Sequence, residues 1–523
     1  MRHSNRHRPA RLLVALAAAS VAALTTSLPA LASSFAASST VQVGDHPFPA
    51  PVCNQSLITP GTLQPGTNNL GAEVEPYVDV DRSSIDPITG VAQNVIGVFQ
   101  QDRWSNGGAH GLVTAVSHDG GATWPVVNFA PFDVCTGGPA YERSSDPWVS
   151  FAPSGDAYQI AISFDVSGPA FGGPSAVLVS KSTDHGNSWG PATTVKADTS
   201  PNALNDKESI TADPNTSNNV YAVWDRLVSP TVQASPTGFE HALGFRGPAW
   251  FSRTTDAGAA WEPARMIFDP GQENQTIGNQ IVVRPSSVGG GLVDGFNLIS
   301  NFKNTNQARG FNVAVLTSAD QGVSWSGPVI VDKLNFAPVR IPATGAAVRT
   351  GDIIPEFAGD RSNGNVYAVW QDSRFLGHSN VAFSMSKDGG RSWSRTIRVD
   401  QAGANQAFTP MVHVATDGTI GVSYYEMIDA AGDTNTVLVH CHPNGAADCS
   451  HAADWTPDPA TFVAGPYAMT TAPRAGGFFV GDYEGLTDYG THGFRPFFIQ
   501  ARPLATAGLT DPFTATVCPS SGC

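Results

Sequence analysis

The chain has 523 residues, and its 44 acidic against 29 basic residues give a formal net charge of −15. This acidity argues against a nucleic-acid partner. No apolar run beyond the first 32 residues reaches the length of a membrane span, which argues against insertion into a membrane.

Residues 1–32 have the pattern of a secretory signal peptide. Four arginines precede an apolar, Ala-rich run from Leu12 to about Leu24, and Ala30-Leu-Ala32 forms a small-residue cleavage site. A membrane anchor is the alternative interpretation. Removal of this segment leaves 25 basic and 44 acidic residues, a net charge of −19. The sequence therefore predicts a secreted, extracellular protein.

Two further regions follow the signal peptide. Residues 33–70 are rich in Pro, Ser, Thr and Gly and predict an irregular lead-in. No linker or low-complexity stretch divides residues 71–523, so we expect one domain there. That length is large for one domain, unless the domain consists of repeated units that contact only their neighbours.

One eight-residue pattern, Ser/Thr-x-Asp-x-Gly-x-x-Trp, occurs five times at intervals of roughly 65 to 70 residues. In this pattern the Asp can accept backbone N–H bonds, the Gly can adopt positive φ, and the Trp can bury its ring between neighbouring units. We therefore expect a structural turn at each copy rather than a ligand site. The five copies, called boxes below, are 117–124, 182–189, 254–261, 318–325 and 386–393.

The boxes resemble the Asp box, or BNR repeat, of sialidase-like β-propellers. The resemblance covers the chain from about residue 71 and implies an all-β propeller of four-stranded blades. In that family the box turns lie on the face away from the active site. The resemblance therefore implies no catalytic role for the boxes.

A second repeat, a short strand that ends in an aromatic residue, precedes each box. Its clearest copies are Asn219-Val-Tyr-Ala-Val-Trp224 and Asn365-Val-Tyr-Ala-Val-Trp370. Counting both repeats predicts seven blades, whereas the sialidase family has six, which is the alternative. The last unit lacks a fourth strand, and Thr40-Val-Gln-Val43 could supply it by closing the ring.

Six cysteines in an exported chain predict disulfides. Two short loops suggest that Cys441 pairs with Cys449 and that Cys518 pairs with Cys523. By elimination, Cys53 would pair with Cys135. The Cys441–Cys449 loop stands where the other units have a box, so a disulfide is expected to replace the Asp turn in the sixth unit.

Strand direction places the starts of the first strands and the ends of the second strands on the face opposite the boxes. Charged residues gather at these positions, where they could act as acids, bases or carboxylate ligands. Alternatively, they could cap strands or join adjacent blades. The charged residues at these positions include Arg103, Asp146, Glu208, Arg226, Glu356, Arg374, Glu426, Asp482 and Glu484.

The resemblance to sialidases implies an arginine clamp for a substrate carboxylate, a Tyr nucleophile with a Glu helper, and an Asp acid/base. Arg103, Arg226 and Arg374 could form the clamp. Val339-Arg340-Ile-Pro342 matches a family segment and adds Arg340. The catalytic candidates are Tyr483, Glu484, Tyr425, Glu426, Asp146 and Glu208, and the binding candidates are Arg103, Arg226, Arg374, Arg340, Glu356 and Asp482.

Two functions remain open at this point. The first is a glycosidase that removes sialic acid or another acidic sugar, and the second is a non-catalytic propeller that binds glycans or proteins. We expect a monomer with a glycan or glycoconjugate partner and no cofactor, with calcium as an alternative because of the clustered acids.

Overall fold

The structure is a computed structural model that describes residues 1, 34–44, 48, 52–167, 172–229, 246–300, 310–443, 448–502 and 510–523. The expected signal peptide lies outside these residues apart from Met1. Over the described ranges, we find no helix of the length and apolarity needed to cross a membrane. These ranges form strands and short 3-10 helices, so the protein is all-β, as predicted.

The first two sheets are antiparallel and join through a single pairing of β5 with β7. Their strands are β3 (Glu73–Val80), β4 (Val95–Arg103), β5 (Ala109–Ser117), β6 (Val126–Asn128), β7 (Arg143–Phe151), β8 (Ala157–Phe164), β9 (Ser175–Ser182) and β10 (Thr193–Asp198).

Four separate antiparallel sheets follow, each with its four strands paired in chain order. The first two consist of β11 (Ala203–Ala212), β12 (Val220–Val228), β13 (Ala249–Thr254) and β14 (Arg265–Phe268), and of β15 (Gln275–Val283), β16 (Leu292–Ser300), β17 (Gly310–Ser318) and β18 (Ser326–Lys333). The other two consist of β20 (Glu356–Gly359), β21 (Val366–Asp372), β22 (Asn380–Ser386) and β23 (Ile397–Arg398), and of β24 (Gln406–Val414), β25 (Ile420–Met427), β26 (Asp433–Cys441) and β27 (Thr461–Ala468).

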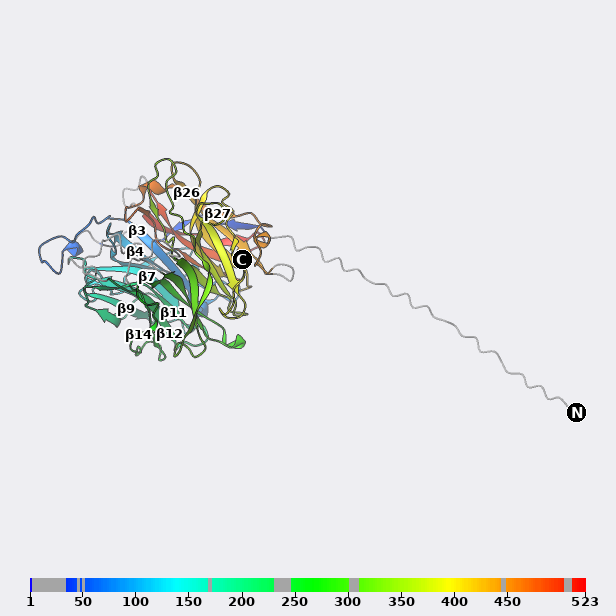
Figure 1. The fold of residues 1–523 in the computed structure, drawn as a ribbon, viewed down its shortest axis with the longest axis horizontal. Coiled ribbons are helices and arrows are strands. Elements are labelled where there is room, and N and C mark those ends of the chain that lie inside the picture. The colour runs from blue at the N-terminus through cyan, green and yellow to red at the C-terminus, as the bar shows by residue number, and fades with distance from the viewer. Residues whose placement is uncertain are drawn as a thin grey trace. The chain divides into compact units, whose positions relative to one another are not determined.

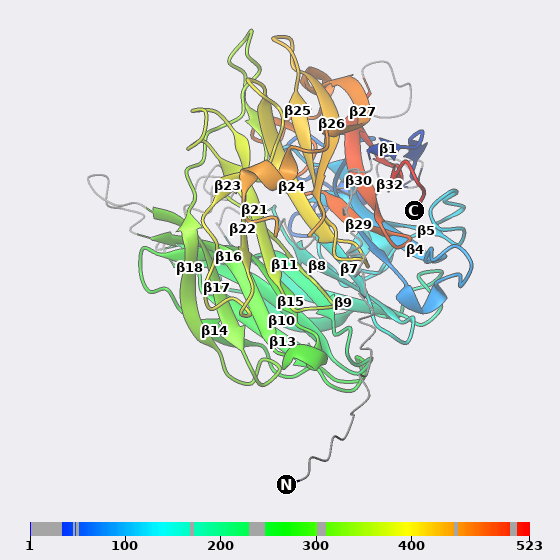
Figure 2. The ribbon, with the colours of Figure 1, turned by 90° about the vertical axis from the view of Figure 1, so that its right-hand side faces the viewer.

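The last sheet combines both ends of the chain. It contains β29 (Gly485–Tyr489), β30 (Gly493–Ala501) and β31 (Thr510–Thr514), and its outer strand is β2 (Val41–Gln42), with Val41 opposite Thr514. In Figure 2, β1 (Phe35–Ala37) also lies beside β32 (Val517–Pro519), with which it pairs. The prediction that residues 40–43 supply the missing strand is confirmed.

The sheets form a closed ring. The first strand of each sheet contacts the first strand of the next, in the order β3, β7, β11, β15, β20, β24 and β29, and β29 returns to β3. Figure 1 shows β3, β7 and β11 side by side, with β9 and β14 farther out. A ring of radially arranged antiparallel sheets is a β-propeller.

The sequence explains why these strands stack. Every residue of β4 and β5 is buried, since each inner strand is covered on both faces by neighbouring sheets. Aromatic and β-branched residues fill the spaces between sheets: Tyr221, Val223 and Phe251 of one sheet contact Ile281 and Leu292 of the next. Such interdigitation supplies most of the hydrophobic stabilisation.

The five boxes share one set of hydrogen bonds. In the first box, Ser117 Oγ donates to Asp119 and accepts from the Gly121 N–H. Asp119 also accepts the backbone N–H of Thr123 at 2.8 Å. The Trp rings lie between sheets, as Trp124 against Phe497 and Trp325 against Phe251 show. The expectation of a structural turn is therefore confirmed.

The boxes lie on the same face as the turns between first and second strands. The backbone of Gly120 donates to Gln93, and that of Ala257 donates to Asn218. Both acceptors belong to such turns. The sixth unit lacks a box, yet Trp455 fills a comparable place against Phe383 of the preceding sheet.

Two of the three predicted disulfides are present. Cys441 is bonded to Cys449 and Cys518 to Cys523. The Cys53–Cys135 prediction is wrong for this structure, because both cysteines are free thiols although they lie close together. His110 is the third member of their cluster, and elimination among cysteines alone could not have revealed it.

Candidate functional site

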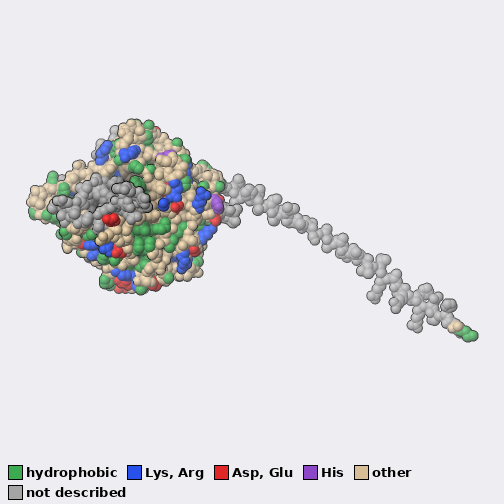
Figure 3. Space-filling view, viewed as in Figure 1, with side chains coloured by type: hydrophobic (Ala, Val, Ile, Leu, Met, Phe, Trp, Pro, Cys, Tyr) green, Lys and Arg blue, Asp and Glu red, His purple; other side chains and the backbone are tan. Residues whose placement is uncertain are grey.

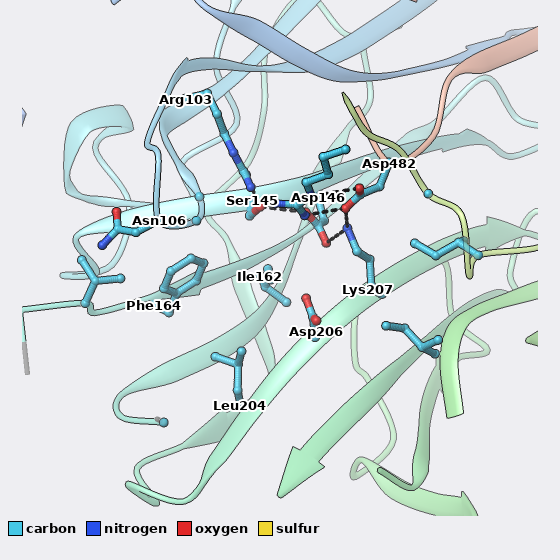
Figure 4. Close-up of a pocket in the computed structure, with 18 of the residues that line it drawn as sticks. Arg103, Asn106, Ser145, Asp146, Ile162, Phe164, Leu204, Asp206, Lys207 and Asp482 are labelled. Atoms are coloured by element: carbon cyan, nitrogen blue, oxygen red, sulfur yellow. Dashed lines mark hydrogen bonds and ion pairs between the residues drawn. The ribbon is translucent and has the colours of Figure 1, made fainter. Parts of the chain in front are cut away.

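A pocket of about 390 Å³ opens where the starts of several first strands converge. Figure 4 shows Asp146, Lys207 and Asp482 close together, with Phe164, Ile162 and Leu204 to their left and Asp206 between Leu204 and Lys207. Ile277, Ile353 and Ile354 extend the apolar lining. The charged side chains that line the pocket are Arg103, Asp146, Asp165, Asp206, Lys207, Arg349, Asp352 and Asp482.

Bulges in the first strands bring three charged side chains together. In β3, β7 and β11 the pairing register shifts at Glu75, Asp146 and Lys207, and these residues have φ of 53°, 55° and 48°. Positive φ costs a non-glycine residue of order 1–3 kcal/mol, and such residues cluster at functional sites. The repeated bulge turns each of these side chains toward the same space.

Lys207 is the centre of the charged cluster. Its Nζ lies 3.2 Å from Glu75, 3.1 Å from Asp146 and 2.9 Å from Asp482. Burial alone would lower the pKa of Lys207, but the surrounding carboxylates outweigh burial and hold this pKa well above its ordinary value. Lys207 is therefore a permanent cation among acids drawn from three parts of the chain.

Two arginines complete the cluster. Arg349 of β19 (Val348–Arg349) donates from Nε and Nη2 to the two oxygens of Asp482, at 3.1 and 2.7 Å. Burial opposes ionisation of Asp482, but Arg349 and Lys207 hold its pKa far below the usual range. Arg103 donates to Gln100 at 2.7 Å and lies 3.6 Å from Glu75. Both guanidinium groups thus already face acceptors of the protein itself.

Two carboxyl groups of the pocket behave differently from Asp482. Burial, together with repulsion from Asp146 and Asp482, raises the pKa of Asp206 to about 7 although Lys207 opposes the shift. Burial and repulsion from Asp482 likewise raise the pKa of Asp352 to about 7. Near neutral pH each group exists in both protonation states, the condition that suits acid/base catalysis.

A small cavity of about 10 Å³ shares Asp146, Lys207 and Ile354 with the pocket, and three further predicted residues line it. Tyr483 is 3% exposed, lies 5.7 Å from Trp148 by ring centroids, and donates from its hydroxyl to the Pro147 carbonyl. Glu208 and Glu356 are also buried, and burial raises the pKa of both, that of Glu356 to about 8. All three side chains are buried between the strands and do not line the pocket.

The other aromatic and acidic candidates lie outside the pocket. The Tyr425 hydroxyl donates to the Ile499 carbonyl at 2.9 Å. Glu484 is buried beside Tyr425, and burial raises its pKa to about 8. Glu426 accepts a hydrogen bond from Asn405.

The expected arginine clamp is not assembled. Arg226 forms an ion pair with Asp198, and Arg374 pairs with Asp332 and Asp372. Asp198 and Asp332 belong to the outer strands of the preceding sheets, so these arginines join neighbouring sheets. Arg340 donates to the Gly345 carbonyl and does not line the pocket. Of the predicted residues, Arg103, Asp146 and Asp482 line the pocket together.

Sequence reasoning missed five of the eight charged residues that line the pocket: Asp165, Asp206, Lys207, Arg349 and Asp352. A signal existed for two of them, because Asp206 and Lys207 directly precede the predicted Glu208 and make an unusually polar start to an inner strand. The clustered acids that suggested calcium surround Lys207, whose ammonium group supplies the positive charge at this place. This geometry does not favour an ion there.

Comparison with known proteins adds resemblance of fold only. No protein-family model and no curated protein sequence matches the chain. The chain is similar in structure to a Hadza microbial sialidase, Hz136, at 11% identity and a TM-score of 0.44 over 92% of this chain and 99% of that chain. The chain is also similar in structure to a protein of unknown function from Dyadobacter fermentans, at 13% identity and a TM-score of 0.44 over 87% of this chain and 97% of that chain. Its similarity to the α-L-arabinofuranosidase Arb93A from Fusarium graminearum is at 13% identity and a TM-score of 0.43 over 72% of this chain and 92% of that chain.

Proposed function

We propose that this chain is an exported, glycan-active β-propeller of seven blades, and that it hydrolyses glycosidic bonds in the pocket. The ring of seven first strands supports the blade count, and the two disulfides agree with an oxidising compartment. A cavity of about 390 Å³ lies within the usual range for small-molecule sites.

The observation that carries the proposal is the pair Asp206 and Asp352, two carboxyls with pKa near 7 in one pocket. Glycoside hydrolysis needs one carboxylic acid to protonate the leaving oxygen and one carboxylate to activate water or to attack the sugar. Either residue can hold the proton while the other is ionised. Asp146 is held ionised by Lys207 and Asp482 by Arg349 and Lys207, and both carboxylates would stabilise positive charge on the sugar ring.

The contacts of Arg349 and Arg103 with acceptors of the protein favour a neutral sugar over the acidic sugar expected from the sequence. Arg349 is engaged by Asp482, and Arg103 by Gln100 and Glu75. An acidic sugar would have to displace Asp482 from Arg349, which would leave this buried carboxylate with Lys207 as its remaining cationic partner. The apolar side formed by Ile162, Phe164 and Leu204 suits the C–H face of a sugar ring. Charged side chains of both signs are also interspersed on the face shown in Figure 3.

A panel of fluorogenic neutral, amino and acidic glycosides tests this proposal, with Asp206→Asn and Asp352→Asn as variants. Each substitution should lower kcat by about 10²–10⁴-fold, the usual contribution of an acid or base. The wild-type rate should fall on both sides of pH 7, because one group must be protonated and the other ionised. Asp165→Asn is the matched control: Asp165 lines the same pocket and burial raises its pKa to about 6, but its carboxylate accepts the Glu142 backbone N–H and should not be required.

Three results would count against this assignment. Cleavage of sialosides alone would restore the acidic-sugar hypothesis. Equal activity in Asp206→Asn, Asp352→Asn and Asp165→Asn would place the chemistry elsewhere. If the wild type cleaves no glycoside but binds to glycans on an array, the non-catalytic binding propeller is the better description.

A further inference from the structure

A second cluster of chemically reactive side chains lies outside the pocket. One ligand atom each from Cys53, His110 and Cys135 lies within 4.8 Å of the others. Cys53 belongs to the 3-10 helix η1 (Val52–Asn54) of the lead-in, His110 to β5, and Cys135 to the 3-10 helix η3 (Val134–Thr136) after β6. Three segments distant in sequence therefore meet at one point.

His110 has an arrangement typical of a metal ligand. The side chain is 2% exposed, and its Nδ1 hydrogen-bonds to Asp102 Oδ2 at 3.0 Å. Its buried Nε2 has no hydrogen-bond partner among the described residues. A carboxylate on one ring nitrogen fixes the imidazole tautomer and leaves the other nitrogen as a lone-pair donor, as in carboxylate–histidine–zinc sites.

The two thiols complete a donor set. Cys53 and Cys135 are half-buried and form no disulfide, and the Cys135 thiol donates only a long hydrogen bond of 3.9 Å to the Cys53 carbonyl, so a small cation can reach both sulfurs. The neighbouring Asp133 is already occupied, since it accepts from the Thr136 backbone and from Ser144. A Cys53–Cys135 disulfide would use both sulfurs but would leave the buried Nε2 of His110 without a partner, at a cost of about 1–3 kcal/mol.

We propose that Cys53, Cys135 and Nε2 of His110 bind one zinc ion, with water in the fourth position. Two thiolates and an imidazole are donors that zinc prefers in tetrahedral sites. On binding, both thiols release their protons to solvent, and the metal remains divalent. The ion would fasten the lead-in to the sheet that contains β5. This site is independent of the proposed glycosidase activity.

Zinc content is the direct measurement. The full chain, purified without reductant or chelator, is incubated with zinc sulfate, desalted and analysed by elemental mass spectrometry. We expect about one zinc per chain, and less than a tenth of that in Cys53→Ser, Cys135→Ser and His110→Gln. His492→Gln is the control, because its ring is exposed and bonded to Asp417 instead. Asp102→Asn should weaken zinc affinity about 10–100-fold.

A second measurement protects against variants that fail to fold. Cys53 is half-buried, so Cys53→Ser should still fold. Chelation should lower the Tm of the wild type and leave the Tm of Cys53→Ser unchanged. A Cys53–Cys135 disulfide in the native protein, found by alkylation and peptide mass, would overturn the proposal. So would zinc content that is equal in the wild type and all three ligand variants.

Discussion

The box turns and the pocket are built in opposite ways. In each box the Ser/Thr and Asp side chains form hydrogen bonds within the eight residues, as Ser182, Asp184 and Ser188 do. The charged cluster at the pocket joins Glu75, Asp146, Lys207, Arg349 and Asp482, which meet only after the ring has closed. A set of hydrogen bonds within one turn can occur in several copies, so the fold tolerates the loss of one copy. A charged cluster assembled from distant segments occurs once, and it depends on every member.

Removal of Lys207 should have the largest effect on stability. Lys207→Met leaves the buried carboxylates of Asp146 and Asp482 without their shared cation, so the free energy of unfolding should fall by about 3–5 kcal/mol. Urea denaturation followed by Trp fluorescence measures the change. Lys181→Met on the box face, where Lys181 pairs with a half-exposed Asp156, should cost less than about 1 kcal/mol. Equal losses would remove the distinction between the two regions.

The sixth unit tests whether a disulfide substitutes for a box. Replacing Cys441 and Cys449 together by Ala opens an eight-residue loop and should lower the free energy of unfolding by about 2 kcal/mol. Trp455, which donates to the Cys449 carbonyl, reports on local opening through its fluorescence. An unchanged Tm and unchanged Trp455 emission would show that the turn holds without its crosslink.

Two boxes provide an internal comparison of smaller effects. Asp184 accepts a backbone N–H and two hydroxyl hydrogen bonds, whereas Asp256 has Ala260 where the other box has Ser188, and so lacks one hydroxyl donor. Asp184→Ala should cost about 1–2 kcal/mol by thermal denaturation. Asp256→Ala should cost less, and the reverse order would contradict this account of the turns.

The smallest effect is a gain in stability. Because the pKa of Asp352 is raised to about 7, the folded state prefers the protonated acid. The associated stability is fully present below the ordinary pKa near 4 and is lost as the pH rises to about 7. Asp352→Asn should therefore raise Tm by about 2 °C at pH 8 and leave it unchanged below pH 4. Scanning calorimetry at both pH values measures this, and a lower Tm at pH 8 would contradict the assigned shift.

The same contrast explains what could be predicted from the sequence. Box geometry, ring closure by β2 and two disulfides follow from local patterns, and the structure contains them. Strand direction also predicts the correct face for Arg226 and Arg374, but it carries no information on distance from the ring axis. Both arginines turn outward to Asp198 and Asp332, while Arg349 comes from β19, which no repeat predicted. Positions that depend on tertiary closure need the structure.

Ring closure by β2 has a consequence for biogenesis. The outer strand of the last sheet, β2, is synthesised well before its partner β31 (Thr510–Thr514), because the strands of the other six sheets lie between them in the sequence. Until both are available, the growing chain exposes an unpaired strand edge, the kind of surface that promotes aggregation. The ring therefore closes only after β31 has been made, and a premature stop before β31 leaves an open ring.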